Sequence, residues 1–227
     1  MKTIGLLGGT AWVSTIDYYR QINKMVNERL GKNHSAKIIL KSIDYEEIKK
    51  YNYQDWEKIG DVLMDELIDL DSCNIDCILI CNNTLHKSLG QIESNLYLEN
   101  PIFNIIECAG EYAKEQKIDE VLLLGTKFTM EDGFYQDKLK KYDIKVKIPD
   151  DDDRNEIQRI IQEELSKEKI LDISKEKIKN IVEKNKCKAV IVGCTELPMI
   201  VRQDGFDIPI LNTLELHCKK AVDFALN

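Results

Sequence analysis

Short apolar runs alternate along the chain with longer segments in which apolar residues recur every three or four positions. The short runs predict buried strands, and the longer segments predict helices with one apolar face. We expect strands over residues 2–7, 38–43, 77–80, 101–105, 121–124, 189–192 and 209–213. We expect helices over residues 16–30, 56–70, 107–116, 134–140, 154–165, 175–186 and 214–226, with a short one after residue 45. This alternation predicts parallel sheets covered by helices on both faces.

Polar residues at the element boundaries indicate where helices begin. Ser14 or Thr15 is predicted to cap the first helix, and Ser174 the helix over residues 175–186. Four consecutive aspartates, residues 150–153, have two interpretations. They form a solvated loop that caps the next helix, or they bind a divalent cation.

Four predicted strands end in small polar residues: Gly8-Gly9-Thr10, Asn82-Asn83-Thr84, Gly125-Thr126 and Cys194-Thr195. Open α/β sheets bind ligands beyond the carboxyl ends of their strands. The strand and helix pattern also divides the chain into two halves. The Asn82 segment and the Cys194 segment lie at comparable positions in the two halves. A pseudo-twofold arrangement would make these two segments face each other across one cleft.

Composition narrows the possible partners. The chain has 227 residues, enough for one large or two small α/β domains, and a formal charge of −8 with a pI near 5.1. This charge argues against nucleic acid and against an anionic membrane as partners. No apolar run is long enough to span a membrane, and the apolar N-terminal stretch is too short for a secretory signal. We therefore expect a cytoplasmic protein.

The seven cysteines are an odd number in a sequence without an export signal, which argues against a disulfide framework. Cys73, Cys77 and Cys81 are spaced by four, but a strand through Cys77 would point them in different directions, so we expect no metal site. Cys194 differs from the others because it lies between glycine and threonine at a strand end. It is the candidate reactive thiol, and the remaining cysteines are interpreted as small buried apolar residues.

The glycine turn after the first strand presents backbone N–H groups at a helix N-terminus, where an anion is favoured. The turn lacks the full dinucleotide fingerprint and the phosphate-loop lysine. A small carboxylate fits it as well as a nucleotide does. His86 lies near the start of a predicted helix, where it is either a base or, more in keeping with its position, a structural residue.

Several motifs together resemble the cofactor-independent aspartate/glutamate racemase family, closest to its L-aspartate/glutamate-specific branch. They are GLLGGTAWVST at residues 5–15, CNNTLHKS at 81–88, LLLGTKFTM at 122–130 and GCTELP at 193–198, supported by SIDYEEI at 42–48, FYQDKL at 134–139 and IIQEEL at 160–165. The resemblance covers essentially the whole chain. Any one of these motifs alone would be weak, but their joint occurrence in this order is specific.

The resemblance implies two flavodoxin-like α/β domains related by pseudo-twofold symmetry, with the site in the cleft between them. Residues 1–98 and 213–227 would form the first domain and residues 99–212 the second. It also implies a homodimer that acts on aspartate or glutamate without pyridoxal phosphate, any other cofactor or a metal. In such racemases two thiols flank the substrate α-carbon, because inversion needs a proton carrier on each side of a planar carbanion.

The resemblance assigns Cys194 to the second catalytic cysteine, but it places Asn82 where the first one, or a threonine, usually stands. A carboxamide neither gains nor loses a proton near neutral pH. Three hypotheses follow: a racemase in which Cys194 works one face and a water, Cys81 or Thr84 works the other slowly; a one-base isomerase or decarboxylase-like relative; or a non-catalytic binder of a dicarboxylic amino acid. Cys81 should point to the opposite side of its strand from Asn82, which counts against a simple exchange of roles.

The resemblance further implies a set of groups that bind the substrate. These are Thr10, Asn83, Thr84, Thr126, Thr129 and Thr195 around the α-carbon, with Asn52 and Gln54 as candidates for the side-chain carboxylate. Lys167 is either the cationic partner of the substrate or a solvated lysine at a helix end, and Arg154 and Lys127 are its rivals for that charge.

Overall fold

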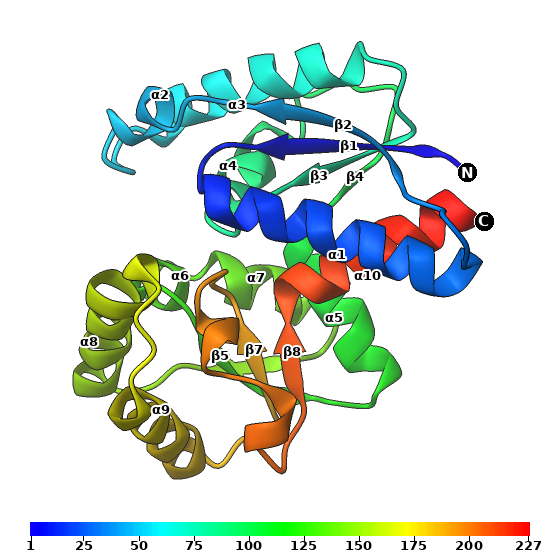
Figure 1. Cartoon of the computed structure of the whole chain (residues 1–227). Coiled ribbons are helices and arrows are strands. Elements are labelled where there is room, and N and C mark those ends of the chain that lie inside the picture. The colour runs from blue at the N-terminus through cyan, green and yellow to red at the C-terminus, as the bar shows by residue number, and fades with distance from the viewer. The chain divides into compact units, whose positions relative to one another are not determined.

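The computed structural model describes all 227 residues, which fold into two α/β units (Figure 1). Unit 1 comprises Met1–Ile105 and His217–Asn227, and unit 2 comprises Ile106–Leu216. The domain division predicted from the sequence placed residues 99–105 in the second domain. In the structure, strand β4 (Ile102–Phe103) instead pairs with strand β3 (Cys77–Ile80) of unit 1, because Ile102 and Phe103 continue that sheet opposite Ile78 and Leu79.

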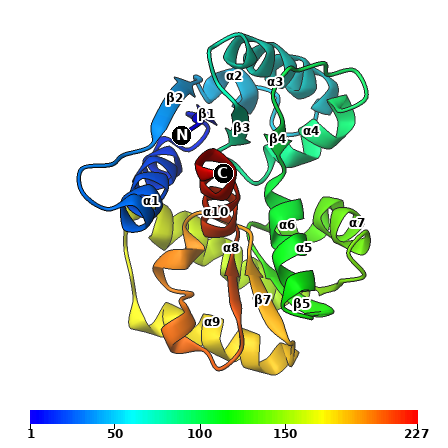
Figure 2. The ribbon, with the colours of Figure 1, turned by 90° about the vertical axis from the view of Figure 1, so that its right-hand side faces the viewer.

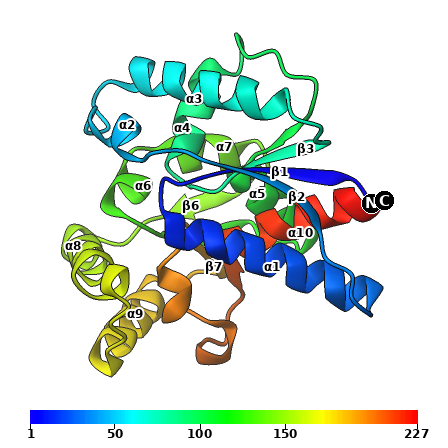
Figure 3. The ribbon, with the colours of Figure 1, turned by 45° about the horizontal axis from the view of Figure 1, so that its top comes forward.

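Unit 1 contains a four-stranded parallel sheet in the order β2-β1-β3-β4. Its other strands are β1 (Thr3–Gly8) and β2 (Lys37–Ser42), and its helices are α1 (Trp12–Leu30), α2 (Glu46–Lys49), α3 (Trp56–Asp71), α4 (Leu85–Ile92) and most of α10 (Thr213–Leu226). Helices α1 and α10 lie on one face of the sheet and α3 and α4 on the other (Figure 3). The Lys2 N–H donates to the Ala225 carbonyl at 2.9 Å, which holds the two chain ends together.

The core of unit 1 follows the predicted apolar positions. Ile59, Leu63, Leu67 and Leu70 of α3 are fully buried, and so is every residue of β3. Each such side chain contributes roughly 1.5–3 kcal/mol by leaving water. Burial on both faces explains why β3 reads as a continuous apolar run.

Unit 2 contains a second parallel sheet in the order β6-β5-β7-β8. Its strands are β5 (Glu120–Leu124), β6 (Lys145–Lys147), β7 (Ala189–Val192) and β8 (Ile210–Asn212), and its helices are α5 (Ile105–Glu115), α6 (Lys127–Glu131), α7 (Phe134–Lys140), α8 (Asp151–Arg159) and α9 (Asp172–Asn185). Shorter turns are a π-helical one, Ile160–Glu164, and 3-10 helices at Leu165–Lys167, Leu197–Met199 and Gln203–Gly205. Helices α8 and α9 lie on one face of this sheet and α5 and α7 on the other (Figure 2).

The two sheets share one strand order, in which the first strand of each lies between the second and the third. This is the order of flavodoxin-like sheets. The predicted α/β class with two parallel sheets is confirmed. The sequence did not reveal edge strand β6, because Val146 is flanked by two lysines and leaves no apolar run.

Two predicted helix caps are wrong. Helix α1 begins at Trp12, so Ser14 and Thr15 lie inside its first turn, where the Thr15 hydroxyl accepts from the Gly9 N–H at 3.1 Å. Helix α9 begins at Asp172, and the Ser174 hydroxyl donates at 2.6 Å to the buried Glu164 carboxylate instead of capping the helix. In both cases a tertiary contact takes the hydroxyl that the sequence assigns to the helix end.

The acidic run forms the first turn of α8. Asp150 is its N-cap and accepts from the Asp153 N–H at 3.0 Å. Lys184 contacts both carboxylates, at 2.6 Å for Asp150 and 2.8 Å for Asp153. Of the two interpretations, these contacts match the capping one.

No helix of the protein is long and apolar enough to cross a lipid bilayer.

The turn after β1 depends on Gly9, which has a φ of +98°. A Cβ atom there would lie 2.1 Å from the Ile43 carbonyl oxygen and 2.6 Å from the Ile43 nitrogen. We expect Gly9→Ala to lower the free energy of unfolding by about 2 kcal/mol or more, from backbone strain and this clash. Urea denaturation followed by circular dichroism measures the change.

Gly90 is the matched control for Gly9, because it is an exposed position of helix α4 and a Cβ there meets nothing within 4 Å. Gly90→Ala should leave stability unchanged or raise it by up to about 1 kcal/mol. Equal effects of the two substitutions would contradict the assignment of strain to the Gly9 turn.

Candidate functional site

The first group of site residues lies at the carboxyl edge of the sheet in unit 1. Strands β1 and β3 are neighbours, with Leu7 opposite Ile80, and the Cys81 N–H donates to the Leu7 carbonyl at 2.8 Å. The structure therefore brings together the segments that carry Thr10 and Asn82. Thr10 is only 5% exposed, and its hydroxyl has no hydrogen-bond partner. A buried hydroxyl without a protein partner is costly, so the Thr10 hydroxyl is available to a bound molecule.

The Asn82 side chain is held by the start of α4. Its Oδ1 accepts from the Leu85 N–H at 2.9 Å, and its backbone carbonyl accepts from His86 Nδ1–H at 2.7 Å. The amide oxygen is thus occupied, and the Nδ2 donor group remains for another contact. Asn83 is buried beside it, and Thr84 is partly buried at the N-cap of α4, where its side chain makes no capping bond.

Buried aromatic residues support this loop from behind. His217 Nε2 donates to the Phe103 carbonyl at 2.7 Å, so its Nδ1 accepts from the Tyr18 hydroxyl at 2.8 Å. Burial lowers the pKa of His217 to about 3, which keeps the ring neutral. His86 packs edge-on against His217 with ring centroids 5.7 Å apart. These contacts match the structural interpretation of His86 rather than a role as base.

Cys81 is poorly suited to replace the missing thiol. Its side chain is completely buried, and this burial raises its pKa far above the ordinary value. A thiolate, the form that removes a proton, is therefore disfavoured at Cys81.

The second group of site residues lies at the carboxyl edge of the sheet in unit 2. Strands β5 and β7 are neighbours, with Leu124 opposite Val192, so the segments that carry Thr126 and Cys194 meet. Thr126 caps α6, and its hydroxyl lies 2.9 Å from the Thr129 hydroxyl. Thr129 is only 1% exposed, and its methyl group packs against the positions of Gly125 and Gly193. In the structure the two threonine hydroxyls are thus hydrogen-bonded to each other.

Cys194 has a defined chemical environment. Its thiol donates to the Glu196 carboxylate at 2.9 Å, and the Thr195 hydroxyl donates to the same oxygen at 2.9 Å. Burial, followed by the Glu196 charge, raises the Cys194 pKa well above the ordinary value, while the N–H groups of Glu196 and Leu197 donate to the sulfur and oppose that rise. The sequence motif contains Glu196, but sequence reasoning gave it no role. Its position two residues after a candidate thiol was the available signal.

Replacing Glu196 by glutamine should lower the pKa of Cys194, because the substitution removes the neighbouring negative charge and leaves the two N–H donors in place. We expect the pH midpoint for alkylation of Cys194 by iodoacetamide to fall. Mass spectrometry of the Cys194 peptide measures it, with Cys187 as an internal reference and exposed Glu163→Gln as the matched control. An unchanged midpoint would show that the Glu196 carboxylate does not act on this thiol.

The predicted cations differ in what they contact. Arg154 pairs with Glu131 at 2.8 Å and with Asp151. Lys127 lies 2.8 Å from the Asn155 Oδ1 and forms an ion pair with Glu131 at 3.9 Å. Lys167, at the end of its 3-10 helix, is exposed and has no ion pair. Lys167 is therefore the one of the three whose charge is not already paired.

Asn52 lies in the turn between α2 and α3, in unit 1. Its φ is 46°, and its side chain is exposed, as is that of Gln54. No hydrogen bond or ion pair joins the Asn52 side chain to the residues at the edge of the first sheet.

Two flavodoxin-like sheets, with a hydrogen-bonded thiol just beyond the end of β7, define an α/β protein with one candidate reactive cysteine. A family model described as Asp/Glu/Hydantoin racemase matches residues 7–221. The chain belongs to this family. It is accordingly an isomerase, a racemase that needs no pyridoxal phosphate.

Solved structures agree with this assignment. A proposed Asp/Glu racemase from Yersinia pestis is 38% identical with a TM-score of 0.92, and an aspartate racemase homologue from Pyrococcus horikoshii OT3 is 30% identical with a TM-score of 0.89; each match covers 100% of both chains. Picrophilus torridus aspartate racemase, at 24% identity and a TM-score of 0.75 over 99% of this chain and 94% of that one, shares the fold.

Proposed function

We propose that the protein racemises aspartate, glutamate or both by removing and returning the α-proton, with Cys194 as the thiol acid and base. The observation that carries this proposal is the Cys194 environment: a carboxylate 2.9 Å from the sulfur to receive the thiol proton, and two backbone N–H groups to stabilise a thiolate. The raised pKa of free Cys194 means that the substrate has to assist. A substrate ammonium group would do so, since a nearby positive charge favours the thiolate.

Removing an α-proton places negative charge on the substrate carboxylate, which has to be bound by prearranged donors. We assign this role to the Thr10 hydroxyl and to Asn83 and Thr84. The Thr195 hydroxyl, which donates to Glu196 at 2.9 Å, would join them by turning to the substrate. The first turn of α1 has no side-chain cap and adds backbone N–H groups. Lys167 and Asn52 are assigned to binding the side-chain carboxylate of the substrate. Thr126 and Thr129 are assigned to holding helix α6 in place.

Asn82 is assigned as a donor rather than as a proton carrier. Its Oδ1 already accepts from Leu85, so the amide presents Nδ2–H to the substrate. This arrangement stabilises charge but moves no proton. Racemisation should therefore be slow or one-sided, with water or Thr84 completing the transfer on the other face.

The test is NMR of L- and D-aspartate and of L- and D-glutamate in D2O with the purified protein, combined with chiral chromatography. Loss of the α-proton signal with inversion supports the racemase. No exchange for any of the four substrates would refute the proposal and favour a non-catalytic dicarboxylic amino-acid binder.

A one-base reaction is the second candidate, favoured by the same two observations that limit Asn82 and Cys81. Asn82 neither gains nor loses a proton near neutral pH, and Cys81 is completely buried with a raised pKa. A one-base isomerase or decarboxylase-like enzyme would exchange deuterium into one enantiomer with retention of configuration. The NMR experiment separates this outcome from inversion.

We further propose that the protein works as a cytoplasmic homodimer. All seven cysteines are free, which suits a reducing compartment. Light scattering after size-exclusion chromatography would give twice the 26.3 kDa chain mass for a dimer. A single-chain mass at micromolar concentration would contradict it.

A further inference from the structure

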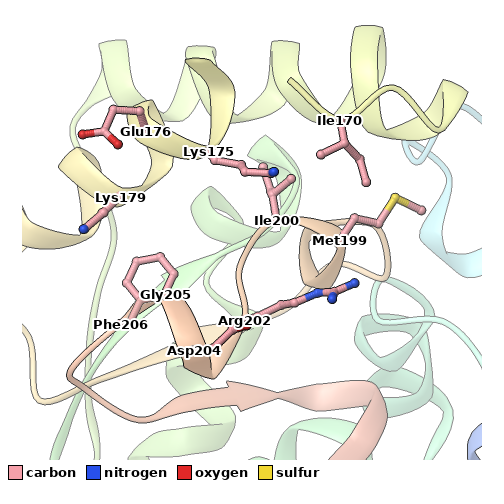
Figure 4. Close-up of a pocket in the computed structure, with 10 residues that line it drawn as sticks. All are labelled: Ile170, Lys175, Glu176, Lys179, Met199, Ile200, Arg202, Asp204, Gly205 and Phe206. Atoms are coloured by element: carbon pink, nitrogen blue, oxygen red, sulfur yellow. The ribbon is translucent and has the colours of Figure 1, made fainter. Parts of the chain in front are cut away.

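A hollow of about 480 Å³ lies within unit 2, between the first half of α9 and the turns that follow β7 (Figure 4). Such a volume is typical of small-molecule sites. Its lining comes from the segment before α9, from α9 itself and from the two 3-10 turns after Cys194: Ile170, Lys175, Glu176, Lys179, Met199, Ile200, Arg202, Asp204, Gly205 and Phe206. None of the residues assigned to the racemase site is among them.

One end of the hollow is apolar. Figure 4 shows the side chains of Ile170, Met199 and Ile200 gathered there, with Phe206 toward the other end. Ile170 is 46% exposed, although it is a large apolar residue. An apolar ligand group placed against these side chains would remove them from water, which is favourable.

The charges around the hollow are of both signs. Arg202 makes a 3.3 Å hydrogen bond from Nε to the Pro198 carbonyl and has no ion pair, so the outer side of its guanidinium group is available for a carboxylate. Asp204, two residues later, has no ion pair either. Lys175 is paired with Asp172 at 2.9 Å and is therefore the weaker candidate for an anion.

We propose that this hollow binds an α-amino acid with an apolar side chain. The ligand carboxylate contacts Arg202, its ammonium group contacts Asp204, and its side chain lies on Ile170, Met199 and Ile200. A simple anion would use Arg202 but leave the Asp204 carboxylate without a partner. A dicarboxylic amino acid would bring a second charge against the apolar end, where its desolvation is unfavourable.

The test is saturation-transfer NMR with L-phenylalanine as probe, compared with 3-phenylpropionate, which lacks the ammonium group, and 2-phenylethylamine, which lacks the carboxylate. L-phenylalanine should bind more tightly than either analogue. Arg202→Gln should weaken L-phenylalanine binding by about tenfold or more, as expected for loss of a charge-assisted bidentate contact. Asp204→Asn should weaken L-phenylalanine binding but not the binding of 3-phenylpropionate.

Two controls locate the binding. Arg20→Gln removes a 69% exposed arginine that pairs with Asp17 on α1, and it should leave the L-phenylalanine affinity unchanged. Cys194→Ala should also leave it unchanged, because Cys194 does not line the hollow. An affinity lost in Cys194→Ala would place the probe at Cys194 and overturn the proposal. Equal binding of 3-phenylpropionate, unchanged affinity in Arg202→Gln, or no saturation transfer at millimolar probe would overturn it as well.

Discussion

Cys194→Ala is expected to lower the rate of α-proton exchange in aspartate or glutamate by at least about a thousandfold, the loss typical for removing a positioned acid or base. The substitution removes the thiol that follows β7, which is 6% exposed, whereas the Cys81 thiol that follows β3 is completely buried. It leaves Glu196 and Thr195 hydrogen-bonded to each other. The exchange rate in D2O, measured by NMR for each enantiomer, gives the result.

The stability of the Cys194→Ala variant has to be checked separately, because the site is buried. Losing one sulfur atom at a partly polar position should cost about 1 kcal/mol or less, so thermal unfolding should change little. Cys187→Ala is the matched control, since Cys187 is partly buried and lies before β7. Exchange at the wild-type rate in a folded Cys194→Ala protein would exclude the thiol mechanism.

The fold could be predicted from the sequence because its strands are buried on both faces. The strands expected over residues 77–80 and 189–192 coincide with β3 and β7. Short-range patterns failed where a tertiary contact decides the outcome. Ser174 looks like a cap, yet buried Glu164 takes its hydroxyl. Strand β6 carries little apolar pattern because it lies at the sheet edge.

The sequence predicts that the candidate residues follow strand ends, and within each unit the structure brings two such segments together. Parallel strands bring their carboxyl ends to one edge, so Thr10 near Asn82 and Thr126 near Cys194 follow from strand order alone. The role of each side chain depends on its rotamer and its burial, which the sequence does not give. Only the structure shows that the Glu196 carboxylate accepts a hydrogen bond from the Cys194 thiol. It also shows that the Asn82 Oδ1 accepts from the Leu85 N–H. Both facts bear on how many proton carriers the site has.

Asn82→Cys is expected to raise the rate of inversion by about a hundredfold over the native protein, because it places an ionisable thiol at the position where the carboxamide carries no proton. The new thiol would lie beside the N-terminus of α4, which lowers a thiol pKa and favours the thiolate. Its cost is loss of the hydrogen bond from the Leu85 N–H, about 1 kcal/mol of stability. Chiral chromatography of each enantiomer over time measures inversion.

Two further variants separate a gained proton carrier from a loosened loop. Asn82→Ala loses the same Leu85 contact without adding a thiol, so it should show no gain in inversion. Combining Asn82→Cys with Cys194→Ala should abolish inversion again, because two proton carriers are needed for it. If Asn82→Cys inverts no faster than Asn82→Ala, then the proton on the second face comes from a group other than residue 82, and Thr84 becomes the next position to replace.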